Sequence, residues 1–338
     1  MDSRAALIDA FLADAGWGEA TRTVLAGDAS FRRYDRLCHG EERAVLMDAP
    51  PPMEDIRPFM RIDRLLCRLG FSAPRIAAAD ADAGLLLLED FGDDTYTRVL
   101  AQGGDERALY ALALDLLIEL HRRSGGCDPE VEGIQPYDDA ALLDEATLLT
   151  DWYMPAVFGQ DTVAAARDDY CALWIELWRH CRGVPDCLVL RDYHVDNLMW
   201  LPDRPGIEAC GLLDFQDARW GPITYDLVSL FEDARRDVQA TLTRDLLARY
   251  RAAFPSLDPE AFAASYALWG AQRSAKILGI FTRLDRRDGK AGYLRHIPRV
   301  WRWLEGDLAH PSLAPLRDWF DRVVPPARRI VPEARGRR

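Results

Sequence analysis

Three oxygen-bearing side chains near the middle of the chain have the types and spacing that phosphoryl transfer requires. An apolar stretch, 188–190, leads into a polar loop in which Asp192 is followed five residues later by Asn197. A second apolar stretch, 211–213, then leads to Asp214. Phosphoryl transfer needs one carboxylate that orients the attacking hydroxyl and accepts its proton, and further oxygen ligands that hold Mg²⁺ against the phosphates of ATP. The spacing therefore predicts Asp192 as the catalytic residue and Asn197 and Asp214 as metal ligands.

The same segment resembles a known family. Asp and Asn side chains often only cap turns, which is the alternative interpretation of an isolated Asp-x-x-x-x-Asn. Together with the second strand and Asp214-Phe215, the loop resembles the catalytic loop and metal motif of aminoglycoside phosphotransferases and choline kinases, which are relatives of the protein kinases. This resemblance implies an α+β, bilobal, protein-kinase-like fold. It has a small N-terminal lobe, with an antiparallel sheet and a helix, and a large, mainly helical C-terminal lobe.

The distribution of apolar residues agrees with this plan. The spacing of Leu7 and Phe11 predicts a short first helix, and the residues 54–69 carry a second helical apolar face. Strands are predicted at 21–26, 31–37, 43–47, 76–79 and 85–89. From about residue 95 the period becomes helical. We therefore expect a nucleotide-binding lobe over 1–90, a catalytic and acceptor-binding lobe over 91–324, and a loose, proline- and arginine-rich tail over 325–338.

Two segments of the first lobe are expected to bind ATP. The turn within 27–34 is rich in small residues, so backbone N–H groups can approach phosphate, although an ordinary hairpin remains the alternative. The candidates on it are Asp28, Ala29, Ser30, Arg32 and Arg33. Asp90-Phe91-Gly92 spells a protein-kinase metal motif, but it precedes the catalytic loop by about 100 residues, whereas the metal ligand must follow it. It is interpreted as the connection between the lobes, with Glu89, Asp90 and Phe91 at the adenine edge.

The chain differs from that family at one position, where the family usually has a positively charged residue. Kinases of this fold usually carry a lysine on the third strand that contacts the α- and β-phosphates, and Met47 occupies that position here. The first 275 residues contain no lysine. Arginine also binds phosphate and stays charged. The candidate replacements are Arg32, Arg33 and Arg43, with the first two favoured; otherwise backbone and metal neutralise the phosphates alone. An acidic partner would be Glu54 or Asp63.

The acceptor is suggested by a finer resemblance. The segments 27–34 and 45–51, with 272–281 and 287–290, resemble one bacterial branch, the anomeric kinases for N-acetylmuramate and N-acetylglucosamine. This resemblance covers most of the chain and implies phosphorylation of the C1 hydroxyl for peptidoglycan recycling. A methionine at the lysine position is also similar to that branch. Candidate acceptor-binding residues are Tyr193, His194, Asp217, Trp220, Arg273 and Lys276. For Arg273 and Lys276, a solvated helix face is the alternative.

The composition of the chain argues against nucleic-acid-binding and membrane-spanning proteins. The chain has 338 residues and a formal net charge of −13, which argues against a nucleic-acid partner. No apolar run approaches the roughly 20 residues that span a bilayer, so no membrane partner and a cytoplasmic location are expected. We expect a monomer. Two rivals stay open: a phosphotransferase for aminoglycosides or choline, and a nucleotide-binding pseudokinase, which the missing lysine favours and the intact Asp192, Asn197 and Asp214 oppose.

Overall fold

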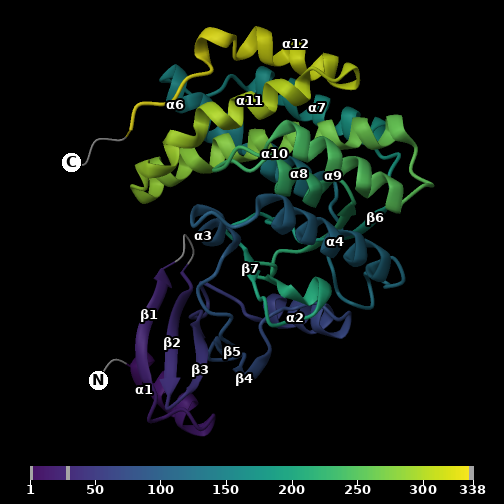
Figure 1. The fold of residues 1–338 in the computed structure, drawn as a ribbon. Coiled ribbons are helices and arrows are strands. Elements are labelled where there is room, and N and C mark those ends of the chain that lie inside the picture. Colours follow the sequence, from purple (N-terminus) through teal and green to yellow (C-terminus); the bar gives the residue numbers. More distant parts are fainter. Residues whose placement is uncertain (1–2, 28–30, 335–338) are drawn as a thin grey trace. The chain divides into compact units, whose positions relative to one another are not determined.

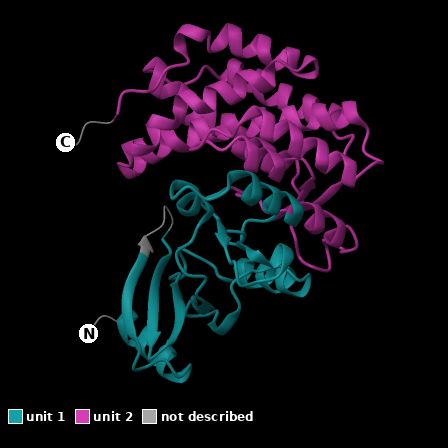
Figure 2. Ribbon diagram, in the orientation of Figure 1, with its two compact units in different colours: residues 1–116, 195–218 teal, residues 117–194, 219–338 magenta. Residues whose placement is uncertain are grey.

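The computed structural model describes residues 3–27 and 31–334. The chain divides into two compact units, coloured separately in Figure 2. Unit 1 comprises residues 1–116 and 195–218, and unit 2 comprises residues 117–194 and 219–338. The chain therefore passes from unit 2 to unit 1 between His194 and Val195, inside the loop that carries Asp192 and Asn197.

A five-stranded antiparallel sheet dominates unit 1 (Figure 1). Its order is β1-β2-β3-β5-β4. The strands are β1 (Thr21–Gly27), β2 (Arg33–His39), β3 (Glu42–Asp48), β4 (Ile76–Asp80) and β5 (Leu85–Glu89). Gly40, with φ 63°, allows the tight turn that sets His39 opposite Glu42. These strands agree with the pattern of apolar residues, because β-branched and aliphatic runs between turn residues favour extended chain.

The two faces of the sheet serve different purposes. Ile8 and Leu12 of α1 (Ser3–Asp14) pack with one set of strand side chains to form a core. The strand members of this core are Leu37, Ala44, Leu46, Leu85 and Leu87. Because side chains alternate along a strand, the intervening residues Val45 and Met47 of β3 belong to the opposite face. That face is available to the site described below.

The remainder of unit 1 places the metal-binding candidates. A two-stranded ladder pairs β7 (Leu198–Trp200) with β8 (Cys210–Leu212), and a short 3₁₀ turn, Gly206–Ala209, precedes β8. Asn197 directly precedes β7, and Asp214 follows β8 after one residue. The helices α2 (Arg57–Arg68) and α3 (Tyr96–Ala101) and the first half of α4 (Glu106–Ser124) complete this unit.

Unit 2 is mainly helical around one long helix. β6 (Asp186–Val189) pairs with β9 (Arg219–Pro222) in a two-stranded ladder. The other elements, apart from the second half of α4, are α5 (Asp139–Ala146), a π-helical turn (Leu149–Tyr153), α6 (Met154–Phe158), α7 (Ala164–His180), α8 (Tyr225–Phe231), α9 (Ala240–Ala253), α10 (Pro259–Asp288), the 3₁₀ turns Ala291–His296, Pro311–Leu313 and Pro326–Arg328, α11 (Ile297–Leu308) and α12 (Ala314–Val323). The 30-residue α10 is buried over much of its length. A Cβ on Gly279 of α10 would overlap the backbone of Leu148, so this glycine permits a close helix contact.

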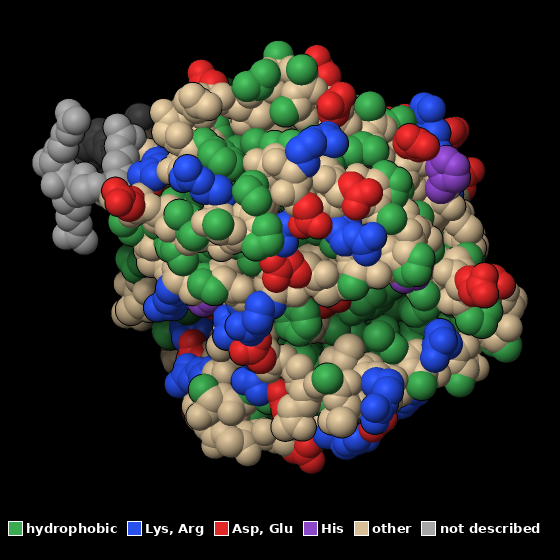
Figure 3. All heavy atoms as spheres, turned by 90° about the horizontal axis from the view of Figure 1, so that it is seen from above, with side chains coloured by type: hydrophobic (Ala, Val, Ile, Leu, Met, Phe, Trp, Pro, Cys, Tyr) green, Lys and Arg blue, Asp and Glu red, His purple; other side chains and the backbone are tan. Residues whose placement is uncertain are grey.

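Ion pairs with α11 and α12 hold part of the C-terminal segment. Arg329 forms ion pairs with Glu305 (2.7 Å) and Asp321 (2.5 Å), and Tyr153 donates to the Ile330 carbonyl at 2.7 Å. Residues 335–338 lie outside the described part of the chain. On the face shown in Figure 3, basic and acidic side chains are interspersed. Over the described residues, no helix combines the length and apolar character that crossing a membrane requires.

Candidate active site

A cavity of about 350 Å³ lies within unit 1, on the sheet face that carries Val45. Its walls come from the sheet, from the segment after β5 and from the β7–β8 ladder. The lining residues are Leu25, Tyr34, Val45, Phe59, Pro74, Leu88, Glu89, Asp90, Phe91, Gly92, Asn197, Met199, Leu213 and Asp214. The cavity therefore brings both predicted metal ligands and all three predicted adenine-edge residues to one mainly apolar hollow. A flat aromatic base with a polyphosphate needs such a combination of apolar walls and a few polar groups.

Asn197 and Asp214 meet in this cavity. The Asn197 amide nitrogen lies 3.5 Å from Asp214 Oδ2, and Gln216 donates to Asp214 Oδ1 at 2.9 Å. Asp214 has a φ of 58°, a left-handed conformation that is uncommon for a residue with a side chain and is frequent at functional sites. One carboxylate and one amide oxygen are ligands of the type that Mg²⁺ takes, with phosphate and water oxygens completing its shell. Among the described residues, no group of three or more His, Cys, Asp or Glu side chains forms a metal site complete in itself.

The segment after β5 is fixed by arginines. Glu89 accepts from Arg204 at 2.7 Å and from Arg75 at 3.2 Å. Arg36 of β2 pairs with Asp90 at 2.6 Å, and the Arg204 guanidinium lies 5.0 Å from the centre of the Phe91 ring. These contacts hold the three residues at the cavity wall. They occupy the carboxylates with protein cations, so the backbone at this segment and the Phe91 ring are what the cavity offers to a ligand.

The expected phosphate-binding turn is only partly described. Asp28, Ala29 and Ser30 lie outside the described residues. Arg32 is within reach of the metal-binding candidates, because its Nη1 atom lies 3.9 Å from Asp214 Oδ1. Arg33 begins β2 and is exposed. Met47 is fully buried on β3.

Asp192 belongs to unit 2, in the turn that follows β6. The residue before it, Arg191, has a φ of 71°, and its backbone is held from both sides. Asp226 of α8 accepts from the Arg191 N–H at 2.9 Å and from the Leu190 N–H at 2.7 Å, while Arg273 of α10 donates to the Arg191 carbonyl at 2.8 Å. These contacts offset the cost of the unusual conformation and fix the direction in which Asp192 leaves the strand.

Arg273 also faces the Asp192 carboxylate. Both of its terminal nitrogens lie 3.4 Å from Asp192 Oδ1. Desolvation works to raise the pKa of Asp192, but the positive charges of Arg273 and Lys276 outweigh it and hold the pKa below its usual range. The side chain is 39% exposed, so it remains accessible to a hydroxyl. Asp192 is therefore an ionised, accessible carboxylate, as a proton acceptor must be.

Lys276 takes part in a buried network. Its Nζ atom donates to Glu145 of α5 at 2.7 Å, and Gln272 donates to the same carboxylate at 3.0 Å. Glu145 also pairs with the Arg191 guanidinium and accepts from the Tyr137 hydroxyl. Sequence reasoning did not identify Glu145, because an acid on a short amphipathic helix carries no signal for a partner 131 residues away.

The other acceptor candidates are distributed over both units. Tyr193 is 1% exposed, and His194 is also buried, with no partner for its Nδ1 atom among the described residues. Trp220 lies half-buried on β9, where its backbone pairs with Leu188 of β6. Asp217 is exposed and belongs to unit 1. Arg273 directly contacts the predicted catalytic carboxylate.

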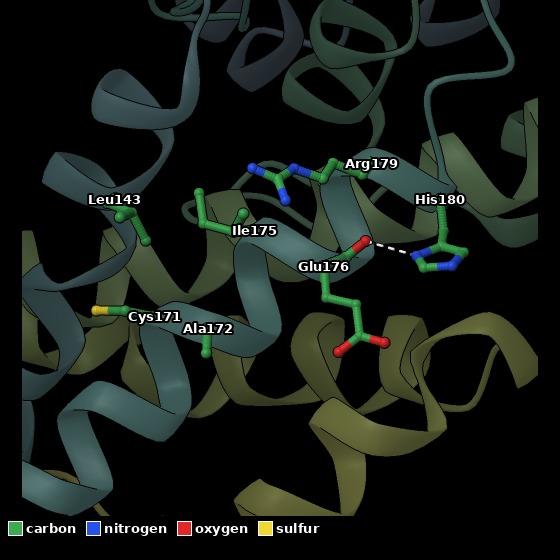
Figure 4. A pocket seen from close by; sticks show the side chains of 7 residues that line it. All are labelled: Leu143, Cys171, Ala172, Ile175, Glu176, Arg179 and His180. Atoms are coloured by element: carbon green, nitrogen blue, oxygen red, sulfur yellow. Dashed lines mark hydrogen bonds between the residues drawn. The ribbon is translucent and has the colours of Figure 1, made fainter.

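Another cavity, of about 510 Å³, lies on unit 2 against α5 and α7 (Figure 4). It is lined by Leu143 and one face of α7. The His180 ring donates to the backbone oxygen of Glu176 at 2.7 Å, an ordinary contact at a helix C-terminus. This cavity contains none of the predicted site residues, so the acceptor is not assigned to it.

Comparison with known families decides the classification. Residues 21–263 match the family model described as the phosphotransferase enzyme family. This chain belongs to the phosphotransferase family. The match spans most of the chain and includes the cavity of unit 1 and the Asp192 turn.

Relatives of this phosphotransferase are similar over nearly their whole length. A protein of Caulobacter vibrioides is 40% identical, with 94% of this chain and 95% of the relative covered. A protein of Pseudomonas aeruginosa is also 40% identical, with 92% and 91% covered. Both relatives are named N-acetylmuramate/N-acetylglucosamine kinase. The kinase names and the family match confirm the prediction that this phosphotransferase is a kinase acting on a hydroxyl group.

Solved structures of other phosphotransferases and kinases confirm the fold. A choline kinase from Streptococcus pneumoniae has a TM-score of 0.59 at 13% identity, covering 90% of this chain and 99% of that one. The GDP complex of the wild-type aminoglycoside 2'-phosphotransferase-IIIa has a TM-score of 0.58 at 15% identity, covering 91% and 99%. The predicted α+β fold, with a small antiparallel sheet followed by a mainly helical remainder, is therefore correct.

Proposed function

We propose that this protein is an ATP- and Mg²⁺-dependent amino-sugar kinase. It phosphorylates the anomeric C1 hydroxyl of N-acetylmuramate, N-acetylglucosamine or both, and releases the sugar 1-phosphate and ADP. A sugar 1-phosphate is the form from which nucleotide sugars are made, which suits a role in the recycling of peptidoglycan.

The observation that carries the proposal is the cavity of unit 1. Its apolar walls suit adenine, and Asn197 and Asp214 stand at its edge as oxygen ligands. The choice of acceptor is supported by the relatives at 40% identity, whose printed names specify N-acetylmuramate and N-acetylglucosamine. The similarity covers more than nine-tenths of both chains. We therefore infer that this protein acts on the same class of acceptor.

The reaction divides into tasks for this chain's own residues. Asp192 accepts the proton of the C1 hydroxyl while that oxygen bonds to the γ-phosphorus of ATP. The bond between the γ-phosphorus and the bridging oxygen breaks, and ADP leaves with the bond's electrons. Arg273 keeps Asp192 ionised and oriented. Asn197 and Asp214 would hold Mg²⁺, which supplies positive charge against the phosphate oxygens.

Asp192→Asn tests the assignment of the base. An amide cannot accept the proton, so turnover with N-acetylglucosamine should fall by roughly 10²–10⁴-fold, while ATP affinity changes little. The measurement is ADP release under saturating ATP, together with nucleotide binding by calorimetry. Near-normal turnover of Asp192→Asn would contradict the assignment.

Asp196→Asn provides the matched control. Asp196 lies in the same loop, and its carboxylate accepts from the Thr97 hydroxyl, which an amide oxygen can still do. This variant should keep most of the activity. Turnover with kanamycin or choline in place of the amino sugars would instead assign the acceptor to the rival class, and nucleotide binding without turnover on any acceptor would indicate a pseudokinase.

A further inference from the structure

The sheet supplies no charge where kinases of this fold place one. Val45 of β3 lines the cavity, and Met47 lies two residues further on the same strand face. Met47 is fully buried and uncharged. A polyphosphate bound beside Asp214 would bring several negative charges towards a carboxylate, which requires a nearby cation.

Arg32 is placed to provide this cation. Its side chain is 13% exposed, its Nη1 atom lies 3.9 Å from Asp214 Oδ1, and its Nε atom lies 3.7 Å from Glu54 Oε2. Glu54 also accepts from the Phe31 backbone N–H at 3.1 Å. Glu54 therefore holds the segment before β2 through two contacts, one with the Phe31 backbone and one with the Arg32 side chain.

The guanidinium of Arg32 lies near two carboxylates, those of Glu54 and Asp214. Good charge-assisted hydrogen bonds between nitrogen and carboxylate oxygen measure about 2.7–2.9 Å, and these two separations are longer. Asp214 would attract the Arg32 guanidinium less strongly if it also held a divalent cation. The terminal nitrogens of Arg32 can then turn to phosphate oxygens, while Glu54 keeps the arginine in place.

We propose that the Arg32–Glu54 pair replaces the missing strand lysine and binds the phosphates of the nucleotide. This inference rests on the proposed function, because it assumes that an adenine nucleotide occupies the cavity. Arg33 is excluded from this role by its position at the exposed start of β2, opposite Asp48 in the register. Sequence reasoning left the two arginines equivalent, whereas their contacts in the structure differ.

The test separates phosphate binding from base binding. The dissociation constants of adenosine and of ADP, each with Mg²⁺, are measured by calorimetry on the full chain without any acceptor. Arg32→Ala should leave adenosine binding unchanged and weaken ADP binding by roughly 10–100-fold, the range expected for lost charge-assisted hydrogen bonds. Arg33→Ala is the matched control and should change neither constant appreciably.

The role of Glu54 is tested by a double-mutant cycle. Glu54→Gln should weaken ADP binding less than Arg32→Ala does, and adding it to Arg32→Ala should produce no further loss, because Glu54 acts through Arg32. Unchanged ADP affinity in Arg32→Ala, an equal loss for adenosine, or independent effects of the two substitutions would each overturn the proposal. If the wild-type protein bound ADP normally but phosphorylated no amino sugar, only the proposed acceptor would fail.

Discussion

Replacing Glu145 should separate a structural network from an acceptor-binding site. Glu145 is a buried carboxylate, 10% exposed, that faces two cations: Lys276 at 2.7 Å and the Arg191 guanidinium. Glu145→Gln keeps the shape of the side chain but removes the negative charge that both cations face. Lys276→Met leaves Glu145 still paired with Arg191. The first substitution should therefore destabilise the protein more than the second.

The magnitude follows from the titration of Glu145. Burial alone would raise its pKa, but the charges of Lys276 and Arg191 prevail and lower it from 4.5 to about 2. A difference of this size between folded and unfolded chains corresponds to about 3 kcal/mol of stability. Because the folded-state pKa is the lower one, this contribution is complete above pH 4.5 and is lost as the pH falls towards 2. A loss of about 3–5 kcal/mol is also usual when one partner of a buried ion pair is removed.

Urea denaturation at pH 7 and at pH 3 measures this contribution. We expect Glu145→Gln to lower the free energy of unfolding by about 3 kcal/mol at pH 7 and by less at pH 3. Asp144→Asn, a change at the exposed neighbouring position of α5, is the matched control and should have little effect. If Lys276 instead binds the acceptor, Lys276→Met would raise the KM for the sugar while Glu145→Gln left stability unchanged. That pair of results would refute the network's structural role.

Two further substitutions test other parts of the structure. A Cβ at position 211 would lie 3.0 Å from Phe91 Cε2 and from Met199 Cβ. Gly211→Ala should therefore displace the cavity wall and weaken ATP binding several-fold in a calorimetric titration. Unchanged affinity would contradict the assignment of these residues to the wall. Burial raises the pKa of the Glu232 carboxyl above its ordinary value of 4.5, so the stability of the wild type should fall as the pH rises above that value. Glu232→Gln should therefore gain stability relative to the wild type between pH 5 and pH 8 in urea denaturation, and parallel pH profiles would show that Glu232 does not titrate in this way.

The sheet of unit 1 could be predicted because its information is local. Each strand is a short aliphatic run between turn residues, and the register follows from tight turns such as the one at Gly40. The pairing of Asn197 with Asp214 was also accessible, because each residue borders a strand of the same two-stranded ladder. The boundaries of these elements differ from the prediction by a few residues at most.

The partners of Asp192 could not be predicted from sequence. Arg273 is 81 positions from Asp192, and Lys276 is 131 positions from Glu145. Both cations lie on a helix whose sequence pattern indicates only burial. Sequence analysis named Arg273 and Lys276 as candidate acceptor-binding residues, with a solvated helix face as the alternative. Long-range packing determines instead which charge faces which, and that information is absent from local spacing. Likewise, the roles of Arg32 and Arg33 can be told apart only when the residue at which β2 begins is known.

Phosphorus NMR of the reaction products tests the central claim most directly. The protein is incubated with ATP, Mg²⁺ and, separately, N-acetylmuramate, N-acetylglucosamine, choline and kanamycin. We predict a new sugar 1-phosphate signal, coupled to the anomeric proton, with one or both amino sugars, and we predict that this signal is absent in the Asp192→Asn variant. A phosphorus signal at another hydroxyl, or only with choline or kanamycin, would contradict it.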